Sequence, residues 1–333
     1  MGAADEDVDS LAADSGDEEK LRASAKTVIE TCMQLRSHEN LLVITDPKTA
    51  EIGQVLYEAG SQVSDRVLMV MMPSTHRHGQ EPPAPVADLM RRQHVVIAAT
   101  RYSLTHTRAR LISSKDGARI ATMPGVTRSM FIEGGMTTDF DVLQTRIAGM
   151  ARILRKHREI SIKNNDGDSL EFTISGRWNL EDNGICNRPG QVTNLPAGKI
   201  FADVKPESVN GVMKINGTWD SISISEPICV IIDEGRVVDI QAPDEGVLNE
   251  QILEFIDENR DSIKMVEFGF GMNPKARISG SALEDEKVLG SCYIVLQQPA
   301  SRRSHEIRAT GILIDPTVML GDYNLIENGK FNE

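Results

Sequence analysis

The chain has 333 residues, of which 40% are hydrophobic and 26% charged, the balance of an ordinary globular protein with enough length for two domains. Its net charge of −13 and the lack of an evident basic stripe argue against nucleic acid as a partner. No apolar run suits a signal peptide or a membrane span, and four scattered cysteines without a CxxC pair indicate a reduced, cytoplasmic protein.

The first 20 residues differ from the rest in charge. They carry eight acids and one lysine, and so hold −7 of the total charge of −13. Such a segment has little apolar surface to bury, and its charges repel one another. We therefore expect residues 1–20 to form a disordered acidic tail.

Residues 21–157 alternate short apolar runs with helical patterns. The apolar runs are LLVITD (41–46), RVLMVMM (66–72), HVVIAAT (94–100) and ARIATMPG (118–125). Apolar strands separated by helices are typical of a parallel sheet that is covered on both faces, so we predict a doubly wound α/β domain. Ligands of such sheets bind at the carboxyl ends of the strands, here Asp46, residues 73–80 and residues 100–106.

Residues 158–333 show a different pattern. Two alternating runs flank Asn-Asp-Gly near residue 166, and two more flank Asp-Glu-Gly near residue 234, which predicts two hairpins. One clear helix is expected, over residues 249–259. We predict a mostly antiparallel α+β domain, with the boundary between the domains near residue 157.

No local motif defines a catalytic site. His76 and His78 could chelate a metal, but no third ligand lies nearby, which favours a surface loop. His106 is interpreted as a polar residue in the first turn of a helix. The acidic run at 283–287, LEDEK, is interpreted as a solvated turn, and the cysteines as core thiols.

Four longer blocks together resemble one family. They are residues 102–127, 194–213, 267–291 and 311–331. In order and spacing they resemble the aminopeptidase T/aminopeptidase S family of metallopeptidases and its relatives, the ring-cleaving 2,5-dihydroxypyridine dioxygenases. The resemblance implies an α/β N-terminal domain, a metal site in the C-terminal domain and a homodimer.

The family's metal-binding positions can be followed one by one onto this chain. Lys199 stands where the family has a glutamate, and Glu267 is the glutamate that precedes its Gly-x-Gly-x-Asn run. Tyr293 stands where the family has a histidine. Arg308 and Thr310 fall on the family's final His-x-Asp. Four of the five ligands that the resemblance implies have therefore changed.

These replacements predict a member of the family without a metal or another cofactor. Lys199 and Arg308 would place two cations beside Glu267, and one unit-charge interaction at about 4 Å is on the order of 4 kcal/mol at an effective dielectric near 20. We expect these three residues to form one pocket with a net charge of +1 that binds a small carboxylate or a peptide. Thr310 and His106 are further candidates for ligand binding.

Two alternatives remain open. The chain could be an enzyme, either a hydrolase or a ring-opening dioxygenase that holds one divalent ion such as zinc or iron through Glu267, Glu286 and His305. Metal-independent chemistry is a variant of that reading, with Lys199, Glu267 and Tyr293 as candidate catalytic residues. The chain could also be a dimeric scaffold subunit.

Overall fold

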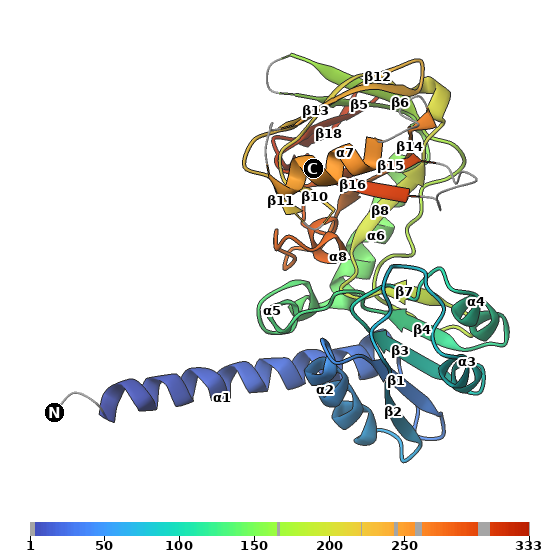
Figure 1. Cartoon of the computed structure of the whole chain (residues 1–333), viewed down its shortest axis with the longest axis vertical. Helices are drawn as coiled ribbons and strands as arrows, with labels where there is room; N and C mark the ends of the chain where they lie inside the picture. Colours follow the sequence, from blue (N-terminus) through green and yellow to red (C-terminus); the bar gives the residue numbers. More distant parts are fainter. Residues whose placement is uncertain are drawn as a thin grey trace. The chain divides into compact units, whose positions relative to one another are not determined.

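The chain divides into two compact units in its computed structural model (Figure 1). The first unit comprises residues 1–144 and 181–197, and the second comprises residues 145–180 and 198–333. This differs from the single boundary predicted at residue 157, because residues 181–197 return to the first unit. The structure describes residues 4–164, 167–220, 222–242, 246–256, 262–298 and 307–332.

The first unit is built on a five-stranded parallel sheet. The strand order is β2-β1-β3-β4-β7, and every neighbouring pair is parallel. The elements are α1 (Ala4–Thr27), the π-helix η1 (Val28–Cys32), β1 (Leu41–Thr45), α2 (Ala50–Ser61), β2 (Val67–Met71), α3 (Ala84–Met90), β3 (Val95–Ala99), α4 (Arg108–Lys115), β4 (Arg119–Thr122), α5 (Arg128–Ile132), the 3-10 helix η2 (Gly135–Thr137), the start of α6 (Phe140–Leu154), and β7 (Val192–Asn194).

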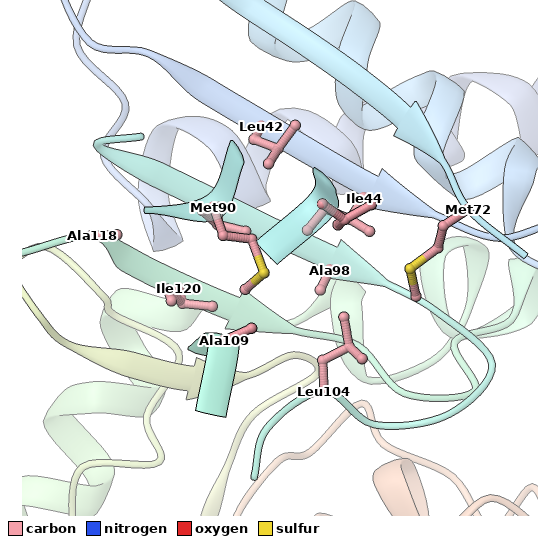
Figure 2. Close-up of a cluster of buried hydrophobic side chains, with 11 residues drawn as sticks. Leu42, Ile44, Met72, Met90, Ala98, Leu104, Ala109, Ala118 and Ile120 are labelled. Carbon is pink, nitrogen blue, oxygen red and sulfur yellow. The ribbon is translucent and has the colours of Figure 1, made fainter. Parts of the chain in front are cut away.

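Helices cover both faces of this sheet, as the sequence predicts. Leu42 and Ile44 of β1 point to one face, where they join a buried cluster with Met90 of α3 and Ala109 of α4 (Figure 2). Thr45 points to the other face, where a Cβ on Gly53 would meet the Thr45 Cβ at 2.8 Å. The glycine thus lets α2 pack closely against β1, and the predicted doubly wound α/β arrangement is confirmed.

The acidic N-terminal segment differs from the sequence prediction. Residues 4–20, which were expected to be disordered, form the first part of helix α1. Two of the acids have cationic partners: Asp17 pairs with Lys20 at 3.1 Å, and Glu18 pairs with Arg128 at 2.8 Å. These pairs reduce the repulsion on which the prediction of disorder rested.

The second unit contains two antiparallel sheets. Their strand orders are β11-β10-β16-β15-β14-β8 and β13-β12-β9-β6-β5-β17-β18-β19. Besides the end of α6, its elements are β5 (Glu159–Lys163), β6 (Ser169–Thr173), β8 (Lys199–Asp203), the 3-10 helix η3 (Pro206–Ser208), β9 (Asn210–Ile215), β10 (Thr218–Trp219), β11 (Ile222–Ser223), β12 (Ile228–Asp233), β13 (Arg236–Gln241), α7 (Val247–Ile256), β14 (Lys264–Gly271), α8 (Ala282–Asp285), β15 (Cys292–Gln298), β16 (Ile307–Leu313), β17 (Thr317–Leu320), β18 (Tyr323–Glu327) and β19 (Lys330–Phe331).

The local predictions for this unit are confirmed. The strands β5 and β6 pair as one hairpin, and β12 and β13 pair as another. The turn of the second hairpin requires positive φ at Glu234 (45°) and Gly235 (77°), which explains the glycine. Helix α7 covers most of the predicted helix at 249–259, whose last residues lie outside the described part of the chain. Among the described residues, no helix is long and apolar enough to cross a membrane.

Candidate functional site

Four strands of the six-stranded sheet place the predicted site residues on one face. Gly271 of β14 is the Cα partner of Lys199 on β8, and Gly269 of β14 is the partner of Tyr293 on β15. Residues two apart on a strand point to the same side, so Glu267 shares this face with both glycines. Arg308 of β16 lies four residues before Ile312, the partner of Tyr293, and because four is an even number it joins the same face.

The three predicted charged residues come together. The Lys199 ammonium lies 3.7 Å from Oε1 of Glu267, and Nη2 of Arg308 donates to Oε2 of Glu267 at 3.2 Å. The side chains of Lys199 and Glu267 are 12% and 14% exposed, whereas that of Arg308 is 41% exposed. The predicted meeting of these residues is confirmed, and their role in binding a ligand stays a prediction.

Tyr293 contacts both Glu267 and Lys199. It is fully buried, and its hydroxyl donates to Oε1 of Glu267 at 2.8 Å. The Lys199 ammonium lies 4.8 Å from the centre of the Tyr293 ring, within the range of a cation–π contact. A Cβ on Gly269 would lie 2.5 Å from the nearest ring carbon, so glycine at position 269 leaves room for the tyrosine.

Lys287, which the sequence did not indicate, and Glu286, which was expected only as a fallback metal ligand, also belong to this cluster. Oε2 of Glu286 accepts from Lys199 at 2.9 Å, and its Oε1 accepts from Lys287. Lys287 is fully buried and also donates to the carbonyl of Leu283 at 3.0 Å. The interpretation of residues 283–287 as a solvated turn is therefore wrong.

Hydrogen bonds of Asp285 explain why this acidic run is buried. Asp285 is fully buried, and it accepts from the backbone N–H of Ser279 at 2.7 Å and from the hydroxyl of Thr218 at 3.0 Å. These bonds fix the short helix α8 and with it the adjacent Glu286. A run of charges in the sequence does not reveal that each one has a buried partner.

The charges of the cluster do not cancel. Within the described part of the chain, the ion pairs join Lys199, Lys287 and Arg308 to the two carboxylates of Glu267 and Glu286, which is three positive charges against two negative ones. Burial raises the pKa of Glu286, but the two neighbouring ammonium groups outweigh burial and hold its pKa below the ordinary value of 4.5. Glu286 is therefore an anion at neutral pH, as it must be to balance the lysines.

The described residues of this cluster do not fit a divalent cation. No group of three or more His, Cys, Asp or Glu side chains within the described ranges is placed to hold a metal ion. All four carboxylate oxygens of Glu267 and Glu286 already interact with Lys199, Lys287, Tyr293 or Arg308. His305, the third fallback ligand, lies outside the described residues.

The described hydrogen bonds of Thr310 are made by its backbone and join it to Asp220, not to this cluster. Its backbone N–H donates to Oδ1 of Asp220 at 2.8 Å, and its carbonyl accepts from the Asp220 N–H at the same distance. Burial raises the pKa of Asp220 to about 6, and the bond from Thr310 opposes that rise. Asp220 is a half-buried acid that sequence reasoning did not single out.

The remaining candidates lie in the first unit. Asp46 accepts from the N–H of Arg101 at 2.7 Å, so the carboxyl ends of β1 and β3 meet as predicted. Nδ1 of His78 accepts from the N–H of Ser103 at 3.1 Å, and burial lowers the pKa of this histidine. His106 lies in the loop before α4, and its part in ligand binding stays a prediction.

Comparisons with known proteins give a consistent result. The profile of a family described as 2,5-dihydroxypyridine 5,6-dioxygenase matches residues 20–292. No curated protein matches the chain. A solved structure of 2,5-dihydroxypyridine dioxygenase from Pseudomonas putida KT2440 is similar with a TM-score of 0.76 and 14% identity, over 94% of this chain and 96% of that one. Wild-type AmpT from Thermus thermophilus is similar with a TM-score of 0.66 and 13% identity, over 95% and 100%.

Proposed function

This chain belongs to the 2,5-dihydroxypyridine 5,6-dioxygenase family, and we propose that it is a metal-independent member that binds an organic carboxylate. The observation that carries the proposal is the position of the Lys199 ammonium. It lies 2.9 Å from Glu286 and 3.7 Å from Glu267, and so supplies the positive charge that both carboxylates need. Glu267 is also the one implied metal ligand that the chain retains.

Electrostatics disfavours a metal ion in this cluster. A divalent ion beside Glu267 would be repelled by Lys199 and Arg308, each at on the order of 4 kcal/mol per unit charge for about 4 Å and a dielectric near 20. It would also have to break the hydrogen bonds that Glu267 accepts from Tyr293 and Arg308. An anion meets neither obstacle.

Arg308 is the residue best placed to bind that anion. Its guanidinium has five N–H donors, and one nitrogen, Nη2, bonds Glu267. The side chain is 41% exposed, so part of the guanidinium faces solvent. A planar guanidinium binds a carboxylate through two parallel hydrogen bonds, which suits a small organic acid or the C-terminus of a peptide.

The first test measures metal binding directly. We expect elemental analysis of the purified protein, before and after incubation with zinc or iron(II), to find no stoichiometric metal. Near one equivalent of metal per chain that is lost in Glu267→Gln would contradict the proposal.

A second test restores the ligands that the resemblance implies. The variant Lys199→Glu, Tyr293→His, Arg308→His and Thr310→Asp should gain affinity for a divalent ion. The matched control makes the same three charge changes on exposed residues of this unit, Lys264→Glu, Arg236→His and Ser223→Asp, and should gain none. No gain in the first variant would mean that the positions do not correspond to a metal site.

The carboxylate is tested by calorimetry with benzoate, succinate and a dipeptide, and with benzamide as the neutral control. We expect binding of at least one carboxylate, weakened roughly tenfold by Arg308→Ala, the size expected for a lost charged hydrogen bond. The variant Arg308→Lys should keep the charge but lose the two-point geometry, and so bind with intermediate affinity. Equal binding of benzamide would contradict recognition of the charge.

One observation favours a second candidate function, that of a metal-dependent dioxygenase or hydrolase. Glu267 and Glu286 contact the same ammonium, so two of the three fallback ligands lie close together. If that reading holds, Lys199→Met should bind zinc or iron(II) through the two carboxylates that no longer share the Lys199 ammonium, and metal should promote oxygen uptake or peptide hydrolysis by the wild type. The homodimer remains a proposal that light scattering can test.

A further inference from the structure

A cleft of about 590 Å³ opens in the second unit, between the end of α6 and the turn that follows β6. This volume lies within the roughly 300–1,000 Å³ that is usual for pockets that hold small molecules. Its walls include Leu154, Arg155, His157, Arg158, Arg177 and Trp178.

Positive charge is concentrated in this cleft, although the chain as a whole carries −13. Arg158 donates to the carbonyl of Gly176 and so ties one wall to the other. Among the residues that the structure describes, no carboxylate pairs with Arg155 or Arg177. Three guanidinium groups around one cavity, two of them without an acidic partner there, favour a ligand with more than one negative charge.

An aromatic platform lies beside the arginines. Nε1 of Trp178 donates to the carbonyl of His157 at 3.4 Å, and the indole packs against the rings of Phe268 and Phe270 at centroid distances of 6.2 and 5.8 Å. Both phenylalanines are fully buried, so the indole rests on a fixed surface. A half-exposed indole held in this way can contact a planar or apolar part of a ligand.

Helix stabilisation explains only part of this arrangement. Cations at the C-terminus of a helix interact favourably with its dipole, which accounts for Arg155 directly after α6. It does not account for Arg177, which follows β6, or for the indole beside it. The arginines come from two separate segments that meet at one cavity.

We infer that this cleft binds a small organic phosphate, with the phosphate at Arg155 and Arg177 and a planar part at Trp178. The cleft is separate from the carboxylate site, because Phe268 and Phe270, which support Trp178, alternate along β14 with Glu267 and Gly269 and point to the opposite face of the sheet. The inference therefore does not depend on the proposed function.

Tryptophan fluorescence tests the inference directly. The chain has two tryptophans, Trp178 at the cleft and Trp219, which is only 1% exposed. The variant Trp219→Phe therefore leaves Trp178 as the only source of tryptophan fluorescence. In that background we expect ATP without magnesium to change the fluorescence in a saturable manner. Tripolyphosphate, which has no ring, should bind more weakly, and calorimetry on the same protein should detect both.

Charge variants provide the control. Arg155→Ala with Arg177→Ala should weaken ATP binding at least roughly tenfold, because the phosphate loses charged hydrogen bonds to both arginines. Arg236→Ala with Lys264→Ala changes the net charge equally on exposed residues of the same unit and should leave binding unchanged.

Four results would overturn the inference. The first is that neither method detects binding of ATP or tripolyphosphate at millimolar concentration. The second is an equal loss of ATP affinity in both double variants, and the third is adenosine binding as tightly as ATP. The fourth is binding of an RNA oligonucleotide or an acidic peptide without binding of the small phosphates.

Discussion

Two buried sets of ion pairs, one in each unit, differ in how completely they are closed. In the first unit, Nη1 and Nη2 of Arg119 each lie 2.8 Å from a different oxygen of Glu39. The two side chains are only 7% and 6% exposed, and Arg119 also donates to the carbonyl of Met33 at 3.1 Å. One cation meets one anion, with two parallel hydrogen bonds between them.

The cluster in the second unit is less completely paired and more exposed than the Arg119 pair, and we call it the open cluster. Its three cations share two carboxylates, one positive charge is in excess, and Arg308 is 41% exposed. A closed pair fixes the fold and leaves no donor for a ligand, whereas an open cluster retains capacity to bind an anion. If the proposed function holds, completeness of pairing, rather than burial of charge, distinguishes this binding site from a structural ion pair.

Breaking the closed pair should have the largest effect on stability. Glu39→Gln leaves the Arg119 charge buried without its partner, and we expect the free energy of unfolding to fall by about 3–5 kcal/mol. Asp116→Asn removes the acid of an exposed pair, with Arg91 at 3.1 Å, and should cost less than about 1 kcal/mol. Denaturant titration of both variants checks this, and equal losses would contradict the distinction.

Removing the central cation of the open cluster should cost less. Lys199→Met leaves Glu286 with Lys287, and Glu267 with Tyr293 and Arg308, so we expect a loss of about 2 kcal/mol at pH 7. A loss as large as that of Glu39→Gln would mean that the cluster is as closed as the Arg119 pair.

The pH dependence of that loss has a definite sign. The pKa of Glu286 is lower in the folded protein than its ordinary value of 4.5, so its ion pairs stabilise the fold above that pH. This stabilisation is lost as the pH falls below about 4.5 and through the depressed pKa. The stability difference between wild type and Lys199→Met should therefore shrink in acid, and a constant difference would exclude Glu286 as the partner that matters.

Asp220, the half-buried acid that accepts from the Thr310 N–H, should have a smaller effect on stability, and one of opposite sign. Its pKa rises from 3.8 to about 6 on folding, so the folded state holds the proton more tightly, and this contribution to stability falls as the pH rises between those values. Asp220→Asn keeps the acceptor for the Thr310 N–H and removes the buried charge. We expect a gain of about 1–2 kcal/mol at pH 7 and none at pH 3, measured by denaturant titration.

The smallest effect on stability is expected at Arg308. Because the side chain is 41% exposed, its pair with Glu267 is screened by solvent, and Arg308→Ala should change the free energy of unfolding by less than about 1 kcal/mol. The same variant should weaken carboxylate binding. A large loss of stability together with unchanged binding would assign Arg308 to the fold and not to a site.

Much of the fold could be predicted because its signals are local. The apolar runs of the parallel sheet and the turn residues of the two hairpins depend on neighbouring residues, and each predicts its element directly. The cluster of Lys199, Glu267 and Arg308 was predictable only through the order of blocks in a family, because no local pattern joins residues so far apart.

The missed features depend on contacts that the sequence alone does not show. Lys287 can be buried because the carbonyl of Leu283 and Glu286 accept from it, and Glu286 is itself held by Lys199, 87 residues away. The cleft near α6 is cationic because Arg177, after β6, meets Arg155 at the helix end. In each case the sequence shows a charged residue of ordinary surface type, and only the three-dimensional contacts give it a buried or convergent position.

The return of β7 to the parallel sheet has a consequence for synthesis of the chain. This strand (Val192–Asn194) pairs with β4 and ends the sheet, yet the hairpin β5–β6 precedes it in the chain. A nascent chain therefore exposes the edge of β4 until residue 194 has left the ribosome, when part of the second unit has already been made. Folding of the two units must overlap in time, and a fragment cut at residue 144 would keep that edge unpaired and prone to aggregate.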